Sequence, residues 1–157
     1  MRSLSRDVAM LAVMAAAYAA LTLLLAPISF YAVQVRVADA LLALSVVMGP
    51  PAVLGTALGC FIANMLGPFG IVDAVGGSLA NLIATTLAWK LKSRRILALG
   101  QMPFTVSLIV SAYLYQLFDQ PFLITFVYIL VGSIVSIDVI GLALLKAVER
   151  VYRAGPP

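Results

Sequence analysis

Long runs of apolar residues make up most of this chain, and they require surroundings that are not water. Hydrophobic residues account for 64% of the sequence and charged residues for 10%, and the mean hydropathy is +1.13. A soluble domain has about 25% charged residues, so most side chains here have no water to face. We therefore expect an all-α integral membrane protein, with residues 1–157 forming one transmembrane domain.

The apolar runs predict six helices, which are separated by Gly–Pro clusters or by charged residues. A helix that crosses a bilayer needs about 20 apolar residues. The expected helices cover residues 8–26, 37–48, 52–66, 71–91, 96–118 and 122–148. The second and third are short, so they form either one broken hairpin or two short helices that enclose a cavity. Irregular backbone at membrane depth is tolerated beside such a cavity.

The basic residues predict the orientation of these helices. Cytoplasmic loops of membrane proteins are rich in Lys and Arg. With six crossings and both termini in the cytoplasm, each of the ten Lys and Arg residues except Arg36 lies inside. This topology explains the net charge of +4 without nucleic acid as a partner. A signal peptide is the alternative for the N-terminus, but an apolar run that continues to Leu25 is long for one, so we expect a retained first helix.

The sequence lacks the residues and motifs that several classes of enzyme require. The chain has no histidine, the commonest general base and a common zinc ligand. Its single cysteine, Cys60, cannot form an internal disulfide. The phosphate-binding G-x-x-x-x-G-K-[ST] motif and the hydrolase motifs G-x-S-x-G and H-E-x-x-H are missing. Asp73 and Asp138 belong to different depths of the predicted bundle, too far apart to share a proton as in aspartic proteases. We therefore expect no enzyme activity, no metal and no cofactor.

The predicted topology brings a group of polar residues to the outer face of the membrane. A charged residue at bilayer depth costs about 2.5–3.5 kcal/mol on insertion scales and usually faces an interior. Structural explanations remain open: Arg36 and Asp39 can pair with each other, Asp73 can begin a helix, and asparagines can join helices. Because these residues come from separate helices, their convergence favours a ligand site. The candidate residues are Gln34, Arg36, Asp39, Asn64, Asp73 and Asn81, with Phe30 and Tyr31 as aromatic walls.

Small residues recur every four positions along the first predicted helix. Ala12, Ala16 and Ala20 form a stripe, and such a stripe lets the backbone of another membrane helix approach closely. The stripe is therefore a candidate docking face for a partner protein.

Two segments resemble the signature of the QueT family, the substrate-binding S components of energy-coupling factor (ECF) transporters. They are YAALTLLLAPISFYAVQVRVADALLAL (Tyr18–Leu44) and GTALGCFIANMLGPFGIVDAVGGSLANLIAT (Gly55–Thr85). The resemblance implies a six-helix protein of the plasma membrane that captures a queuosine precursor, or a related 7-deazaguanine or purine-like compound, from outside. It also implies that transport requires a transmembrane coupling subunit, which would dock on the alanine stripe, and two ATPase subunits.

The sequence departs from the family pattern, mostly in its C-terminal half. Asp39 stands where glutamate is frequent, and Ser133 follows Gly132 where glutamate is expected. The fifth predicted helix has Ser107 as the nearest polar residue after Pro103, where asparagine is common. Because that half should line part of the pocket, these departures leave the identity of the ligand open.

The candidate side chains complement the edge of a 7-deazaguanine base, which has N–H donors at N1 and N2 and an acceptor at O6. The two aspartates can accept, the glutamine and the arginine can donate, and the asparagines can do both. Two other functions remain open on the sequence. One is a stand-alone carrier that uses Asp39 or Asp73 as a proton site, and the other is an assembly protein without a ligand.

Overall fold

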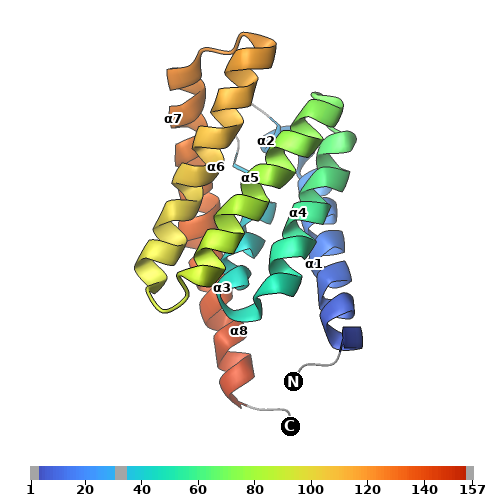
Figure 1. Ribbon diagram of the computed structural model, residues 1–157, viewed down its shortest axis with the longest axis vertical. Helices are drawn as coiled ribbons and strands as arrows, with labels where there is room; N and C mark the ends of the chain where they lie inside the picture. The colour runs from blue at the N-terminus through green and yellow to red at the C-terminus, as the bar shows by residue number, and fades with distance from the viewer. Residues whose placement is uncertain (1–3, 31–34, 155–157) are drawn as a thin grey trace.

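The computed structural model describes residues 4–30 and 35–154, and these residues form an all-helical bundle (Figure 1). The elements are α1 (Leu4–Leu24), α2 (Ala26–Ser29), η1 (Val37–Leu44), α3 (Ser45–Met48), α4 (Pro50–Met65), α5 (Gly70–Lys90), α6 (Arg95–Phe118), α7 (Phe122–Ser133), η2 (Ile134–Gly141) and α8 (Leu142–Ala154). The prediction of an all-α protein is confirmed. Each predicted helix overlaps an observed one, but the second begins as a 3₁₀ helix (η1) and the sixth contains a π-helical segment (η2).

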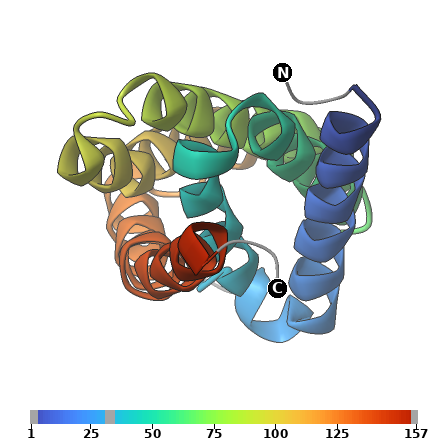
Figure 2. The same ribbon diagram turned by 90° about the horizontal axis from the view of Figure 1, so that it is seen from below.

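The long helices pack against one another in chain order around a short central helix. α1 contacts α4, α4 contacts α5, α5 contacts α6, and α6 contacts α7. The central helix is η1, which contacts η2 on one side and α1 on the other (Figure 2). Polar residues that η1 carries therefore lie inside the bundle.

Glycine and proline set the reversal between α3 and α4. Gly49 has φ +72° and ψ −143°, a backbone conformation that L side chains rarely adopt. Pro50 and Pro51 occupy the first positions of α4, where the missing N–H groups have no intrahelical partner to lose. The chain thus changes direction within one residue, as the Gly–Pro–Pro cluster predicts.

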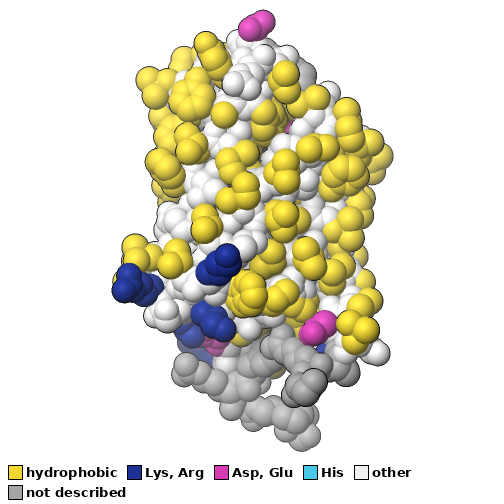
Figure 3. Space-filling model, in the orientation of Figure 1, with side chains coloured by type: hydrophobic (Ala, Val, Ile, Leu, Met, Phe, Trp, Pro, Cys, Tyr) yellow, Lys and Arg dark blue, Asp and Glu magenta, His cyan; other side chains and the backbone are white. Residues whose placement is uncertain are grey.

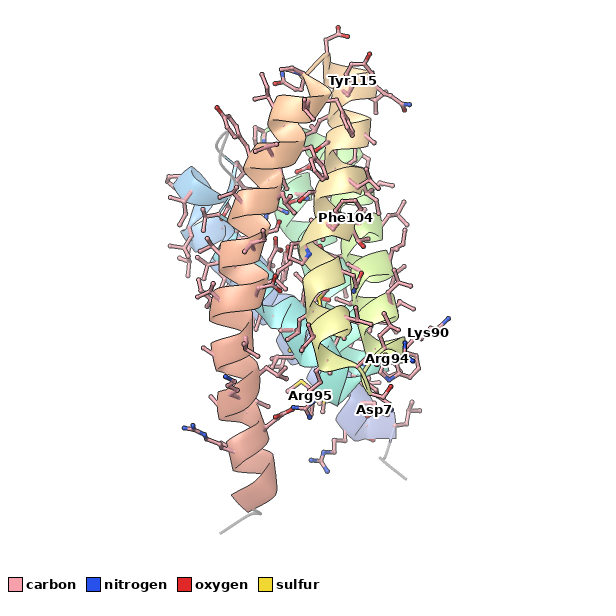
Figure 4. The ribbon with its side chains drawn as sticks, turned by 90° about the vertical axis from the view of Figure 1, so that its left-hand side faces the viewer. Asp7, Lys90, Arg94, Arg95, Phe104 and Tyr115 are labelled. Atoms are coloured by element: carbon pink, nitrogen blue, oxygen red, sulfur yellow. The ribbon has the colours of Figure 1, made fainter. Side chains whose placement is uncertain are left out.

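Hydrophobic side chains cover the sides of the bundle, and basic residues gather at one end. Four helical stretches are long and apolar enough to cross a bilayer: Leu4–Leu24, Gly70–Lys90, Arg95–Leu117 and Phe122–Val151. The visible Lys and Arg residues lie near the lower end in Figure 3. Arg94 and Arg95 lie at the lower end of α6, near Lys90 at the end of α5, and Tyr115 lies toward the upper end of α6 (Figure 4). The start of α1 and the end of α8 are also at the bottom of Figure 1. The chain is a membrane protein by this distribution.

Two glycines of α4 permit an unusually close contact with α1. A Cβ atom at Gly55 would lie 2.7 Å from the carbonyl oxygen of Leu11, and one at Gly59 would lie 2.6 Å from that of Ala15. The obstacle is backbone in both cases, so it cannot move aside like the end of a flexible side chain. The predicted docking residues Ala12, Ala16 and Ala20 remain exposed on α1.

Gly59→Ala is expected to destabilise the protein by about 1–3 kcal/mol, because the added methyl group overpacks the α1–α4 contact. Gly100→Ala is the matched control: a Cβ there meets nothing within 4 Å, and Gly100 is exposed in α6. Alanine should be neutral or stabilising at that helical position. Thermal unfolding of both variants in one detergent measures the difference, and a Gly59→Ala protein as stable as the native one would contradict the close contact.

Candidate ligand site

A small polar cavity lies inside the bundle, between the start of η1 and helices α5, α6 and α7. Its lining residues are Arg36, Asp39, Asp73, Gly77, Asn81, Val106, Val110, Tyr113, Ile129 and Ser133. Four residues that the sequence predicts as ligand-binding are among them, and each of these four is less than 9% exposed. The cavity volume is about 10 Å³, which is close to the minimum for a single water molecule.

Asp39 is held in place by a hydrogen-bonded group that joins three elements. The hydroxyl of Tyr18 (α1) donates to Oδ1 of Asp39 (η1). Nδ2 of Asn81 (α5) donates to the same hydroxyl at 3.0 Å. Tyr18 and Asn81 are almost completely buried, with exposed fractions of 0% and 2%. Because buried polar groups are costly without partners, this group fixes the relative positions of α1, η1 and α5.

Asp73 has one occupied and one unoccupied carboxylate oxygen. The hydroxyl of Tyr113 (α6) donates to Oδ1 of Asp73. Oδ2 of Asp73 is buried and has no hydrogen-bond partner in the part of the chain that the structure describes. Nδ2 of Asn64 donates to the backbone oxygen of Asp73 at 3.0 Å and thereby ties the end of α4 to the start of α5. The carboxylate therefore has acceptor capacity left.

Arg36 lies at the entry to η1 with an extended backbone (φ −84°, ψ 93°). Its guanidinium carbon lies 5.3 Å from the centre of the Phe30 ring, within cation–π range. Its Nη1 lies 3.8 Å from the Sγ atom of Cys60. Its Nε is buried without a partner among residues 4–30 and 35–154. One donor of the guanidinium is thus unused.

The Arg36–Asp39 ion pair considered on the sequence is not formed in the described residues. Asp39 accepts from Tyr18, whereas Arg36 contacts Phe30 and Cys60. The physical reason is the helix start: η1 begins at Val37, so Arg36 lies outside the helical face on which an i, i+3 pair would meet.

The remaining predicted residues have different positions. Asn64 is buried beside Cys60 and Asp73 but does not line the cavity. Phe30 packs close to Gly67, where a Cβ atom would lie 2.8 Å from the Phe30 ring. Gln34 and Tyr31 lie outside the described residues.

Asp138 lies in a separate groove. Arg95, Ile96, Leu99, Gly100 and Leu142 line this groove together with Asp138, whereas Asp73 lines the central cavity. Asp73 in α5 and Asp138 in η2 therefore belong to different sites, as expected from the different depths that the predicted bundle gives them.

Three residues in or next to the cavity are not among the predicted ligand-binding residues. Tyr18 and Tyr113 supply the donors to the two aspartates. Ser133, which the sequence marks only as a departure from the family pattern, lines the cavity. A tyrosine in a membrane helix needs a partner for its hydroxyl when it is buried, and this is the one signal that the sequence offers. It does not identify the partner, because Asp39 is 21 residues from Tyr18 and Asp73 is 40 residues from Tyr113.

The lining offers hydrogen bonds and apolar contacts that suit a small polar molecule. One carboxylate oxygen and one guanidinium N–H have no partner among the described residues, and Val106, Val110 and Ile129 provide an apolar wall. Small-ligand sites have this character, mostly apolar with a few placed polar groups.

Comparisons with known proteins identify the family of the chain. Neither the curated proteins nor the solved structures include a significant match. The family model described as QueT transporter matches residues 8–150. This match includes every described residue of the cavity and extends through the C-terminal half, where the sequence motifs depart most from the family pattern. The chain belongs to the QueT transporter family.

Proposed function

We propose that this chain is the substrate-binding S component of an ECF importer, and that its central cavity takes a queuosine precursor or a related 7-deazaguanine or purine-like compound. Family membership gives the chain a role in transport rather than catalysis, with a small-molecule substrate and a lipid bilayer around it. The proposal adds the substrate class, the capture from outside and the partner subunits.

The observation that carries the proposal is a pair of buried polar atoms, Nε of Arg36 and Oδ2 of Asp73, that have no hydrogen-bond partner within residues 4–30 and 35–154. A buried polar atom without a partner costs about 1–3 kcal/mol, so a ligand that supplies both partners gains that free energy. A guanine-like edge does so, because its N–H groups can donate to Asp73 and its O6 can accept from Arg36. Val106 and Ile129 then flank the ring plane.

The distribution of charge supports six crossings with both termini in the cytoplasm. The start of α1 and the end of α8 lie at the same end of the bundle as Lys90, Arg94 and Arg95. Asp73, which lines the cavity, lies in the first turn of α5, 17 residues before Lys90 and therefore about 26 Å along the helix from the basic end. Under the positive-inside rule the cavity then faces the outside of the plasma membrane.

A binding panel tests the proposed function. The purified protein is titrated with 7-deazaguanine, guanine, adenine and unrelated vitamins, with thermal unfolding and calorimetry as readouts. A compound that binds the folded state raises the unfolding temperature by mass action, and we expect the deazaguanine to do so most. If no purine-like compound binds, the proposed substrate class is wrong.

The exposed alanines of α1 support docking of a coupling subunit. Ala16→Phe is expected to lower uptake by the assembled transporter about tenfold, because overpacking a close helix contact costs about 1–3 kcal/mol. Ligand binding by the isolated chain should not change. The control is Ile83→Phe, which adds the same ring at an exposed position of α5.

Uptake into proteoliposomes with and without the coupling and ATPase subunits separates this proposal from a stand-alone carrier. Equal uptake by the Ala16→Phe and native proteins would contradict the docking face. Concentrative uptake by this chain alone, driven by a proton gradient, would favour the carrier.

A further inference from the structure

We propose that Tyr113 is a displaceable internal plug of the ligand site, an inference that rests on the proposed function. Its ring lines the cavity, and its hydroxyl donates to Oδ1 of Asp73. This hydroxyl occupies Oδ1 of Asp73 and leaves only Oδ2 open to a ligand among the described residues. A guanine-like edge with two N–H groups can use both carboxylate oxygens, and it must then take the place of the hydroxyl at Oδ1. Binding therefore exchanges one donor for another.

Gly76 provides the surface on which the tyrosine ring rests. A Cβ atom at Gly76 would lie 2.6 Å from Cε1 and 2.7 Å from Cδ1 of Tyr113. Gly76 follows Asp73 by three residues in α5, so both lie on one face of the helix. The ring thus lies against α5 next to the carboxylate, in a position that a side chain at residue 76 would block.

The other tyrosine–aspartate pair, Tyr18 and Asp39, is more deeply buried and has more hydrogen bonds than Tyr113 and Asp73. Tyr18 is 0% exposed, and its hydroxyl both donates to Asp39 and accepts from Asn81. Tyr113 is only partly buried, and its hydroxyl bonds to Asp73 alone among the residues described. Tyr113 can therefore leave at the cost of one hydrogen bond, whereas Tyr18 cannot leave without breaking two.

The size of the cavity makes such a movement necessary. Its volume is about 10 Å³, whereas small-molecule sites typically have about 300–1,000 Å³. Among the lining residues, Tyr113 combines a large side chain with partial exposure. Displacement of its ring opens space beside Oδ2 of Asp73. Only a ligand with an N–H donor then replaces the lost hydrogen bond, so the plug favours donor-bearing ligands over analogues that lack one.

Tyr113→Phe tests the plug, because it removes the competing hydroxyl and keeps the ring. Calorimetric titration with 7-deazaguanine is expected to give a Kd about tenfold lower than that of the native protein, since a hydrogen bond to a carboxylate no longer has to be broken. Tyr115→Phe is the matched control on the same helix, with a side chain that is 56% exposed, and its Kd should be unchanged.

Substitutions at the adjacent residues Gly76 and Gly77 provide a second test, because they should change the affinity for the ligand in opposite directions. Gly76→Ala pushes the Tyr113 ring away from α5 and should also tighten binding. Gly77 itself lines the cavity, and Gly77→Ala places a Cβ atom 2.6 Å from Nδ2 of Asn64, so this variant should weaken binding.

The outcomes distinguish the plug from the proposed function. If the native protein binds 7-deazaguanine and Tyr113→Phe binds it equally or more weakly, the plug is overturned and the proposed function stands. If neither protein binds any purine-like probe, both are overturned.

Discussion

Asp73→Asn is expected to weaken binding of the purine-like ligand by roughly 30-fold to more than 1,000-fold and to leave the protein folded. Loss of one partner from a buried, hydrogen-bonded charged contact costs about 2–5 kcal/mol, and each 1.4 kcal/mol is tenfold in Kd. Oδ2 of Asp73 has no partner within the described residues, so the folded protein does not depend on it. Calorimetric titration with 7-deazaguanine measures the loss, and thermal unfolding without ligand verifies the fold.

The control for this experiment is Asp119→Asn, the same change at an exposed aspartate that follows α6. It alters the net charge equally but lies outside the cavity, so binding should not change. An unchanged Kd in Asp73→Asn would remove Asp73 from the site and would direct attention to Asp39 as the carboxylate that contacts the ligand.

Tyr18→Phe is expected to destabilise the protein by about 3 kcal/mol or more, and it should also weaken ligand binding. The Tyr18 hydroxyl has two buried hydrogen-bond partners, Asp39 and Asn81, and both lose this hydrogen bond in the variant. Each buried polar group that loses its partner costs about 1–3 kcal/mol. Thermal or denaturant unfolding in detergent measures the change.

Tyr128→Phe provides the comparison for this prediction, because Tyr128 is 42% exposed on α7. Its unfolding should match that of the native protein. If Tyr18→Phe were equally stable, the Tyr18–Asp39–Asn81 group would not hold α1, η1 and α5 together. The relative stability of these two variants thus tests the inner network without a ligand.

The helical segments follow from local features of the sequence. Apolar runs specify the helices, and the Gly–Pro clusters at residues 49–51 and 67–70 separate them. Two local features were not predicted, the 3₁₀ start of the second helix and the π-helical segment at Ile134–Gly141. Both lie where η1 and η2 pack against each other, and a Cβ atom at Gly141 would lie 3.0 Å from the carbonyl oxygen of Ala40. Their geometry depends on that contact rather than on either segment alone.

Some residues of the site can also be predicted from the sequence, whereas others are identified only by the structure. Arg36, Asp39, Asp73 and Asn81 stand out in the sequence because charge and amide groups are rare and costly in a chain of this composition. The cavity brings the four together. Tyr18 and Tyr113 do not stand out, because tyrosine is compatible with an apolar helix as well as with a membrane interface.

The sequence by itself therefore determined the class of protein, the helical segments and the three charged residues that line the cavity. These properties depend on the cost of placing each residue in or out of a bilayer, which is a property of one residue and its neighbours in the chain. Only the tertiary structure decided that Tyr18 bonds to Asp39, that Tyr113 rests on Gly76 and bonds to Asp73, and that Arg36 contacts Cys60 instead of Asp39. Hydrogen bonds of this kind act over about 3 Å between segments distant in the chain, so their partners are set by how the helices pack.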